Sequence, residues 1–201
     1  CIRDRIKAVK PKLKIGVVAK YMSNEDTYLS VFEAIRSAGW YHNVDIDILW
    51  IDSENISYSK LQELDLDGIV VPGGFGSRGV EGKIESAKFA RETKLPYLGL
   101  CLGMQVAVIE FARKVLNDPN ANSSEMDATA KNQVIHIMPD QIGVDLGGSM
   151  RLGNYKAKLN KKSRAYLAYG QGTATERHRH RYEFNNDYRE VLEKAGLTIA
   201  A

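Results

Sequence analysis

The first half of the chain contains short apolar runs that have the length of buried strands. These runs lie at residues 14–19, 44–51, 68–71 and 95–100. The third run is wholly apolar after its glycine, and it ends abruptly in a Pro-Gly-Gly turn. Near-continuous apolar strands are typical of a parallel sheet that is covered on both faces.

Segments with helical periodicity separate these runs. Apolar residues recur at helical spacing from Tyr28, with a stop predicted at Gly39, and a second helix is predicted over 80–93. A third helix begins directly after Cys101. Its predicted buried side carries Met104, Ala107, Val108, Phe111 and Val115. The alternation predicts an α/β fold with a mostly parallel central sheet and helices on both faces.

The second half is less regular. Residues 117–148 are rich in Asn, Asp, Ser and Gly and are predicted to form a surface loop with one short apolar stretch at 134–138. Strands are predicted at 151–159 and 173–182. A short helix is expected over 188–195, closed by Gly196, and 197–200 resembles the start of a further strand.

Length and composition narrow the class of protein. A chain of 201 residues, 44% hydrophobic and 26% charged, suits one soluble domain, and its net charge of +3 is too small to indicate nucleic-acid binding. No apolar run is long enough to span a membrane. Residues 1–13 are basic without an apolar segment behind them, so we expect a linker or the remnant of an upstream domain. Two cysteines, Cys1 and Cys101, give no disulfide framework and suit the reducing cytoplasm.

Cys101 lies in the pattern Gly99-Leu-Cys-Leu-Gly103 at a predicted strand-to-helix junction. A tight turn of this kind holds a nucleophile in a strained conformation, and glycines two residues to either side let neighbouring backbone pass. A helix N-terminus favours the thiolate form of a cysteine. The alternative is a buried structural cysteine, which is the common state of a lone Cys in an apolar strand. The glycines on both sides favour the interpretation of Cys101 as a nucleophile over that of a structural cysteine.

The turn Pro72-Gly-Gly-Phe-Gly76 follows the neighbouring predicted strand. Its glycines would let backbone N–H groups approach a bound oxygen and provide an oxyanion donor. A phosphate loop or a plain turn remains an alternative, although the Lys-Ser/Thr ending of a P-loop is absent. Because ligands bind at the carboxyl ends of parallel strands, we expect this turn and Cys101 to form one site.

Four motifs extend this picture. They are Val71-Pro-Gly-Gly-Phe-Gly-Ser-Arg-Gly79, Tyr97-Leu-Gly-Leu-Cys-Leu-Gly-Met-Gln105, Gly147-Gly-Ser-Met-Arg-Leu-Gly153 and Glu176-Arg-His-Arg-His-Arg-Tyr-Glu-Phe-Asn185. The chain resembles class I (triad) glutamine amidotransferases, and among them the glutaminase domains of CTP synthases, from about Lys14 to its end. The last two motifs carry the resemblance to CTP synthases. The resemblance implies a flavodoxin-like three-layer fold for residues 14–201.

The resemblance also implies an activity. Glutamine would be hydrolysed through a cysteine thioester, and the ammonia would pass to a synthase (amidoligase) domain that aminates UTP to CTP. No cofactor is expected in this domain. The full-length enzyme would use ATP and Mg²⁺, respond to GTP as an activator, and form a homo-oligomer in the cytoplasm, with no nucleic-acid or membrane partner.

Site residues follow from the same resemblance, motif by motif. Cys101 corresponds to the nucleophile, Gly74 and Leu102 to the oxyanion hole, and Arg151 to a GTP contact; no metal site is implied. The positions that correspond to glutamine-binding residues are Gly74, Leu102, Gly103, Met104, Gln105, Glu125 and Arg181. Physical chemistry agrees, because an α-amino acid needs a carboxylate for its ammonium and a guanidinium or N–H donors for its carboxylate.

Other interpretations remain open for some of these residues. Glu125 lies in a polar segment where a solvated surface acid is common. In the segment 177–181, arginines and histidines alternate, so they would occupy opposite faces of a strand. A His-x-His metal pair, a basic patch or a plain solvated face are alternatives, and we expect the histidines to be structural.

The sequence lacks one expected component. Class I amidotransferases take a histidine base and its orienting carboxylate from a His-Pro-Glu segment near the C-terminus, and no His-x-Glu occurs among His42, His136, His178 and His180. We therefore expect a chain that is truncated at its C-terminus and has little glutaminase activity alone. The alternatives are a catalytically silent module that binds glutamine or nucleotide and another cysteine hydrolase of the same fold.

Overall fold

The computed structural model describes residues 10–20, 25–143 and 151–201. The chain forms two compact units, Cys1–Glu110 and Phe111–Ala201. Residues 1–9 of the expected linker, and most of the motif at 147–153, lie outside the described residues. No helix in the described part of the chain is long and apolar enough to cross a membrane.

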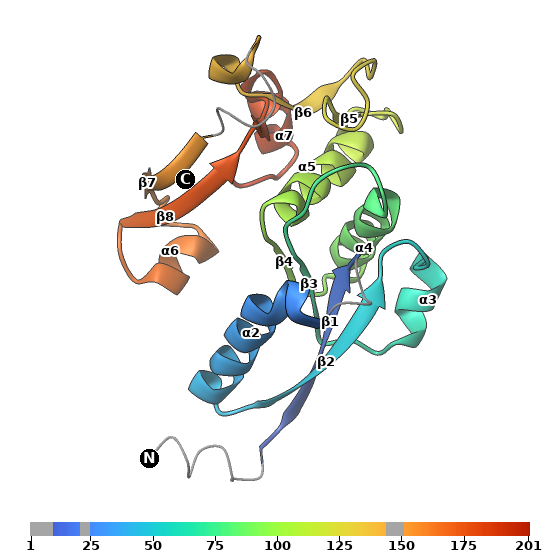
Figure 1. The fold of residues 1–201 in the computed structure, drawn as a ribbon, viewed down its shortest axis with the longest axis vertical. Coiled ribbons are helices and arrows are strands. Elements are labelled where there is room, and N and C mark those ends of the chain that lie inside the picture. The colour runs from blue at the N-terminus through green and yellow to red at the C-terminus, as the bar shows by residue number, and fades with distance from the viewer. Residues whose placement is uncertain (1–9, 21–24, 144–150) are drawn as a thin grey trace. The chain divides into compact units, whose positions relative to one another are not determined.

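The first unit is built on a four-stranded parallel sheet (Figure 1). Its strands, in the order β2-β1-β3-β4, are β2 (Asp45–Asp52), β1 (Lys12–Ala19), β3 (Gly68–Val71) and β4 (Tyr97–Gly99). Parallel pairing brings Val71 opposite Gly99, so β3 and β4 end side by side. The predicted parallel central sheet is confirmed, and the carboxyl ends of its last two strands carry the two glycine-rich motifs.

Helices cover both faces of this sheet. The chain reaches β2 through the 3-10 helix η1 (Glu25–Tyr28) and α2 (Leu29–His42), then turns back through α3 (Tyr58–Glu63) and crosses to β4 through α4 (Val80–Thr93). Because right-handed crossovers in opposite directions place their helices on opposite faces, α2 lies on one side of the strands and α3 and α4 on the other (Figure 1). Ile84, Ala87 and Ala90 are buried, as the pattern predicts.

The predicted stop at Gly39 is wrong. Helix α2 continues to His42 and ends at Asn43, whose φ of 58° is left-handed. A Cβ on Gly39 would lie 2.7 Å from Cγ1 of Ile46, so the glycine allows the helix to pack closely against β2. It marks a helix contact and not a helix end.

The predicted buried side of the helix after Cys101 also needs correction. Helix α5 (Leu102–Val115) buries a stripe displaced from the predicted one, and Met104 is 43% exposed. Of the five residues predicted for the buried side, Val108 is the one that is buried, at 7% exposure. The apolar or small residues of α5 with the least exposure are Leu102, Val106, Ile109 and Ala112.

The second unit contains two small sheets. One has the order β5-β6-β9, from β5 (Asn122–Ser123), β6 (Gln133–Ile137) and β9 (Tyr182–Phe184), and the other pairs β7 (Arg151–Lys158) antiparallel with β8 (Thr173–His180). The remaining elements are the 3-10 helices η2 (Pro139–Gln141) and η3 (Asn186–Tyr188) and the helices α6 (Arg164–Tyr169) and α7 (Arg189–Lys194).

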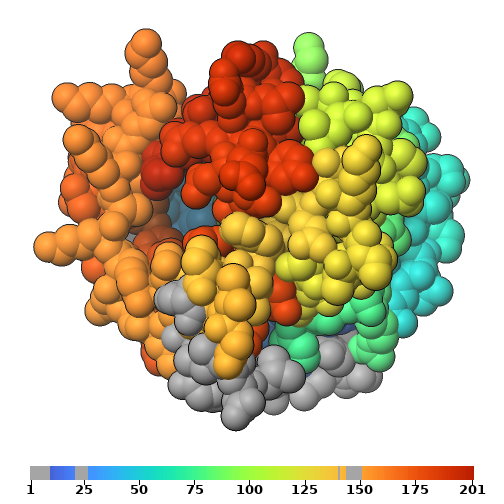
Figure 2. Space-filling view, turned by 90° about the horizontal axis from the view of Figure 1, so that it is seen from above, coloured from blue at the N-terminus to red at the C-terminus, as the bar shows by residue number. Residues whose placement is uncertain are grey.

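The last elements of the chain pack against the rest of the second unit. Helix α7 lies beside the β5–β6 segment in both Figure 1 and Figure 2, and the Tyr188 hydroxyl donates to Oδ1 of Asn132 at 3.1 Å. The strand expected at 197–200 is wrong. The Ala200 carbonyl accepts a hydrogen bond from the Asn160 N–H, and the segment joins no ladder.

Candidate active site

Cys101 is the second of the two residues between the end of β4 and the start of α5. Its φ of 55° is left-handed, a conformation that costs an L-residue about 1–2 kcal/mol, and its side chain is exposed. The N–H groups of Gly103, Met104 and Gln105 turn back onto the carbonyls of Leu100 and Cys101. The thiol is therefore held at a helix N-terminus, where it is accessible, and is not a buried structural cysteine.

Steric contacts explain the two glycines of this strand-to-helix turn, which we call the elbow. A Cβ on Gly103 would lie 2.0 Å from the Val71 carbonyl oxygen, and one on Gly99 would lie 2.4 Å from the Gly103 carbonyl carbon. The Leu100 N–H donates to the same Val71 oxygen at 2.9 Å. The expected role of the glycines, to let neighbouring backbone pass, is confirmed.

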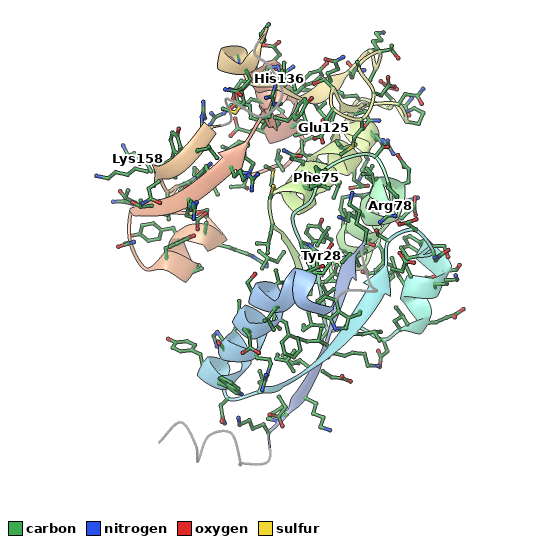
Figure 3. All side chains as sticks on the ribbon, viewed as in Figure 1. Tyr28, Phe75, Arg78, Glu125, His136 and Lys158 are labelled. Atoms are coloured by element: carbon green, nitrogen blue, oxygen red, sulfur yellow. The ribbon has the colours of Figure 1, made fainter. Side chains whose placement is uncertain are left out.

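The glycine-rich turn after β3 lies directly beside the nucleophile. A Cβ on Gly73 would lie 3.2 Å from Cβ and 3.7 Å from Sγ of Cys101. Nζ of Lys20, at the end of β1, donates to the Phe75 carbonyl and so holds the turn. Figure 3 shows that Phe75 and Arg78 come from this segment. The expectation that the turn and Cys101 meet at one sheet edge is confirmed.

Further side chains hold β4, α4 and α5 together. The Tyr97 hydroxyl donates to the Gly103 carbonyl at 2.7 Å, and burial, together with the Glu110 charge, raises the pKa of Tyr97. This hydroxyl therefore stays protonated and ties β4 to the first turn of α5. Further along α5, the carboxylate of Glu110 pairs with Arg91 at 2.7 Å, linking α5 to α4.

Lys83 is a site residue that the sequence reasoning missed. It lies on α4, is completely buried, and places Nζ 3.7 Å from the position that a Cβ on Gly74 would take. Burial, and then the charge of Lys20, lower the pKa of Lys83 from 10.5 to about 8, while the charge of Cys101 raises it. A signal existed, because residue 83 lies in the same helical stripe as Val80, Ile84 and Ala87.

The remaining predicted site residues belong to the second unit. Glu125 follows β5 (Figure 3); it is half-buried, and its N–H donates to the Ser123 hydroxyl at 3.2 Å. Arg181 separates β8 from β9 and is 8% exposed, so the strand expected over 173–182 is in fact two strands. Arg151 opens β7, 3.7 Å from a carboxylate oxygen of Glu183.

The histidines of β8 face away from its arginines, as expected. The rings of His178 and His180 lie 5.2 Å apart and are half-buried, while Arg177 and Arg179 are exposed. Burial, with the charges of His178 and Arg151, lowers the pKa of His180. Within the described ranges, no group of three or more His, Cys, Asp or Glu side chains is arranged to hold a metal ion.

Comparison with known families decides the class of protein. Residues 24–201 match the family described as glutamine amidotransferase class-I. The chain belongs to this family. Among solved structures, this class-I amidotransferase is similar to the glutaminase domain of Trypanosoma brucei CTPS with bound acivicin. That match has a TM-score of 0.86 and 41% identity, and it covers 94% of this chain and 74% of the other.

Curated relatives of this class-I amidotransferase are named CTP synthase. One from Carboxydothermus hydrogenoformans is 54% identical over 202 residues, and one from Listeria innocua is 48% identical over 200 residues. These matches cover 99% and 98% of this chain respectively, but each covers 38% of the relative. The chain therefore spans well under half the length of the curated relatives it matches.

Proposed function

We propose that this class-I amidotransferase hydrolyses L-glutamine through a thioester on Cys101. The observation that carries the proposal is the exposed thiol at a left-handed backbone position, beside the Pro72–Gly76 turn. The thiolate attacks the side-chain amide carbon, the C–N bond breaks, and the nitrogen takes up a proton and leaves as ammonia. Water then hydrolyses the thioester and releases glutamate.

The negative oxygen of the tetrahedral intermediate needs donors that are already in place. The proposed donors are the backbone N–H groups of Gly74, in the turn beside Cys101, and of Leu102, at the start of α5. The Leu102 side chain is 1% exposed, which fixes its backbone. Gly103, Met104 and Gln105 continue the same first turn and would line the glutamine site.

Recognition of the substrate's zwitterion is assigned to two residues of the second unit. Glu125 would accept hydrogen bonds from the α-ammonium group, and Arg181 would pair with the α-carboxylate. The near-complete burial of Arg181 supports a role that needs a fixed guanidinium. Substitution of either residue should weaken glutamine binding more than it slows the chemistry.

The ammonia would be used by a synthase domain of the full-length protein, which would aminate UTP to CTP with ATP and Mg²⁺. Support comes from the name CTP synthase that the relatives carry. GTP is the proposed activator, with Arg151 as its contact. A homo-oligomeric full-length enzyme is part of the same proposal.

A second candidate is a silent module that binds glutamine without hydrolysing it. The observation that favours it is the lack of any His-x-Glu in the 201 residues, since a cysteine of this type needs a histidine base. General base catalysis contributes about 10²–10⁴-fold, so we propose that these residues alone have little glutaminase activity.

The test compares ammonia release from glutamine by this chain and by the full-length protein. We expect robust release by the full-length protein, none after Cys101→Ser, and a trace from this chain. Equal rates from both chains would show that the base lies within these 201 residues. A glutamine-mimicking diazo-ketone tests the silent module, because failure to label Cys101 in the full-length protein would favour it.

A further inference from the structure

The ammonium group of Lys83 is an unusual feature of the first unit. The side chain is completely buried, and Nζ has no hydrogen-bond partner among the described residues. A lysine in a protein interior normally reaches the surface with its charged end or forms an ion pair. Desolvation without a partner disfavours the charged form, so structural packing alone does not account for a lysine at this position.

The location of Nζ suggests what the charge does. It lies on the inner side of the glycine-rich turn, 3.7 Å from the position of a Cβ on Gly74, while the neighbouring Gly73 abuts Cys101. The charges that act on the ammonium come from Lys20, which opposes it, and from Cys101, which favours it. A negative charge at the reacting centre would therefore be stabilised by Lys83.

We propose that Lys83 is a positioning residue for the Cys101 chemistry, placing a fixed positive charge behind the Gly73–Gly74 turn. This inference rests on the proposed glutaminase function and deepens it. The ammonium does not touch the substrate. It stabilises the negative oxygen of the tetrahedral intermediate through the turn, in a low-dielectric environment where a charge acts more strongly than in water.

A dependence on pH follows from the lowered pKa of about 8. Lys83 is mainly an ammonium at pH 7 and mainly a neutral amine at pH 9. The charged groups that face Lys83 are Lys20, which follows β1, and Cys101, which precedes α5, and both are present in the wild type and in a Lys83 variant. The ratio of the two rates at each pH therefore isolates Lys83.

The test measures kcat/KM for glutamine in the full-length protein with Lys83→Met, which keeps the length of the side chain and removes the charge. We expect roughly a tenfold to hundredfold loss at pH 7, mainly in kcat, and a loss that shrinks as pH rises through about 8. Lys88→Met is the matched control, because Lys88 lies on the same helix, half-exposed beside Glu85, and its loss should leave kcat/KM unchanged.

Alkylation of Cys101 by iodoacetamide, followed by peptide mass, separates this inference from the proposed function. If the wild type releases no ammonia, the function fails, and the alkylation ratio between wild type and Lys83→Met decides the role of Lys83. Equal values of kcat/KM in the wild type and in Lys83→Met would overturn the inference. A ratio of wild-type to variant rates that does not change with pH in either assay would also overturn it. Lys83→Leu is a second neutral variant. If circular dichroism shows that neither variant folds, Lys83 is needed for the fold and the inference is also overturned.

Discussion

At the residue scale, Gly103 shows that the backbone of the elbow leaves no room for a side chain at this position. The neighbour that any side chain would meet there is the carbonyl group of Val71, and backbone of a buried central strand cannot rotate away as a side chain can. The elbow glycines are therefore needed for the shape of the backbone that presents Cys101, and not only for the flexibility of the turn.

Gly103→Ala should destabilise the protein and displace the nucleophile. A Cβ 2.0 Å from a carbonyl oxygen forces backbone movement, for which we expect a loss of about 3 kcal/mol in the free energy of unfolding and of most Cys101 labelling. Denaturant unfolding and peptide mapping would measure both. Gly172→Ala is the control, because nothing lies within 4 Å of the added methyl group, and it should change neither quantity.

Lys83 gives a second prediction at this scale, on stability. Its folded pKa of about 8 lies below the ordinary 10.5, so burial of the ammonium destabilises the fold fully below pH 8, by about 3 kcal/mol. As pH rises from 8 towards 10.5, this penalty is lost. Lys83→Met should thus be more stable than the wild type at pH 7, with a difference that narrows above pH 8. Thermal unfolding of both proteins across this pH range would measure the difference in stability. A difference that grew with pH would contradict the prediction.

At the scale of elements, one ion pair joins helices α4 and α5. Arg91 on α4 donates to both carboxylate oxygens of Glu110 on α5, at 2.7–3.1 Å, and the Glu110 side chain is 7% exposed. Hydrogen bonding to Glu110 raises the pKa of Arg91, so the guanidinium is charged at all ordinary pH values. The pair therefore holds α4, which carries Lys83, against α5, which follows Cys101.

Glu110→Gln should cost about 2 kcal/mol of stability, because it removes the buried carboxylate partner of Arg91 and leaves the more exposed Glu92 as its counter-charge. Denaturant midpoints would measure the loss. Glu193→Gln on α7 is the comparison. It breaks an i,i+4 pair with Arg189 whose side chains are both more than 40% exposed, and it should cost about 0.5 kcal/mol or less. Similar costs for both variants would mean that burial does not strengthen the Arg91–Glu110 pair.

The elements that the sequence predicted best have the strongest patterns. Helix α4 matches its predicted bounds because apolar residues mark one face over fourteen residues. Helices α3 and α6 have six residues each, too few for a periodic signal, and their only marks are the capping residues Ser57 and Ser163. The burial of Lys83 was not predicted, because a lysine in an apolar stripe is normally assigned to a solvated edge of the helix.

At the scale of the whole molecule, the proposed machinery is divided between the two units. The nucleophile, the oxyanion donors and Lys83 belong to the first unit, and Glu125 and Arg181 belong to the second. The elbow was predictable because steric rules tie its residue types to one backbone shape. The roles of Glu125 and Arg181 were not predictable from local pattern, because an isolated acid or arginine obeys no such rule and was assigned through resemblance.

The left-handed conformation of Cys101 has a consequence for substitutions at this position. Glycine adopts a φ of 55° freely, so a mutation from cysteine to glycine at this point would relieve strain rather than add it. The backbone at this turn therefore gives no reason for a cysteine, and the proposed reason is the chemistry of its thiol.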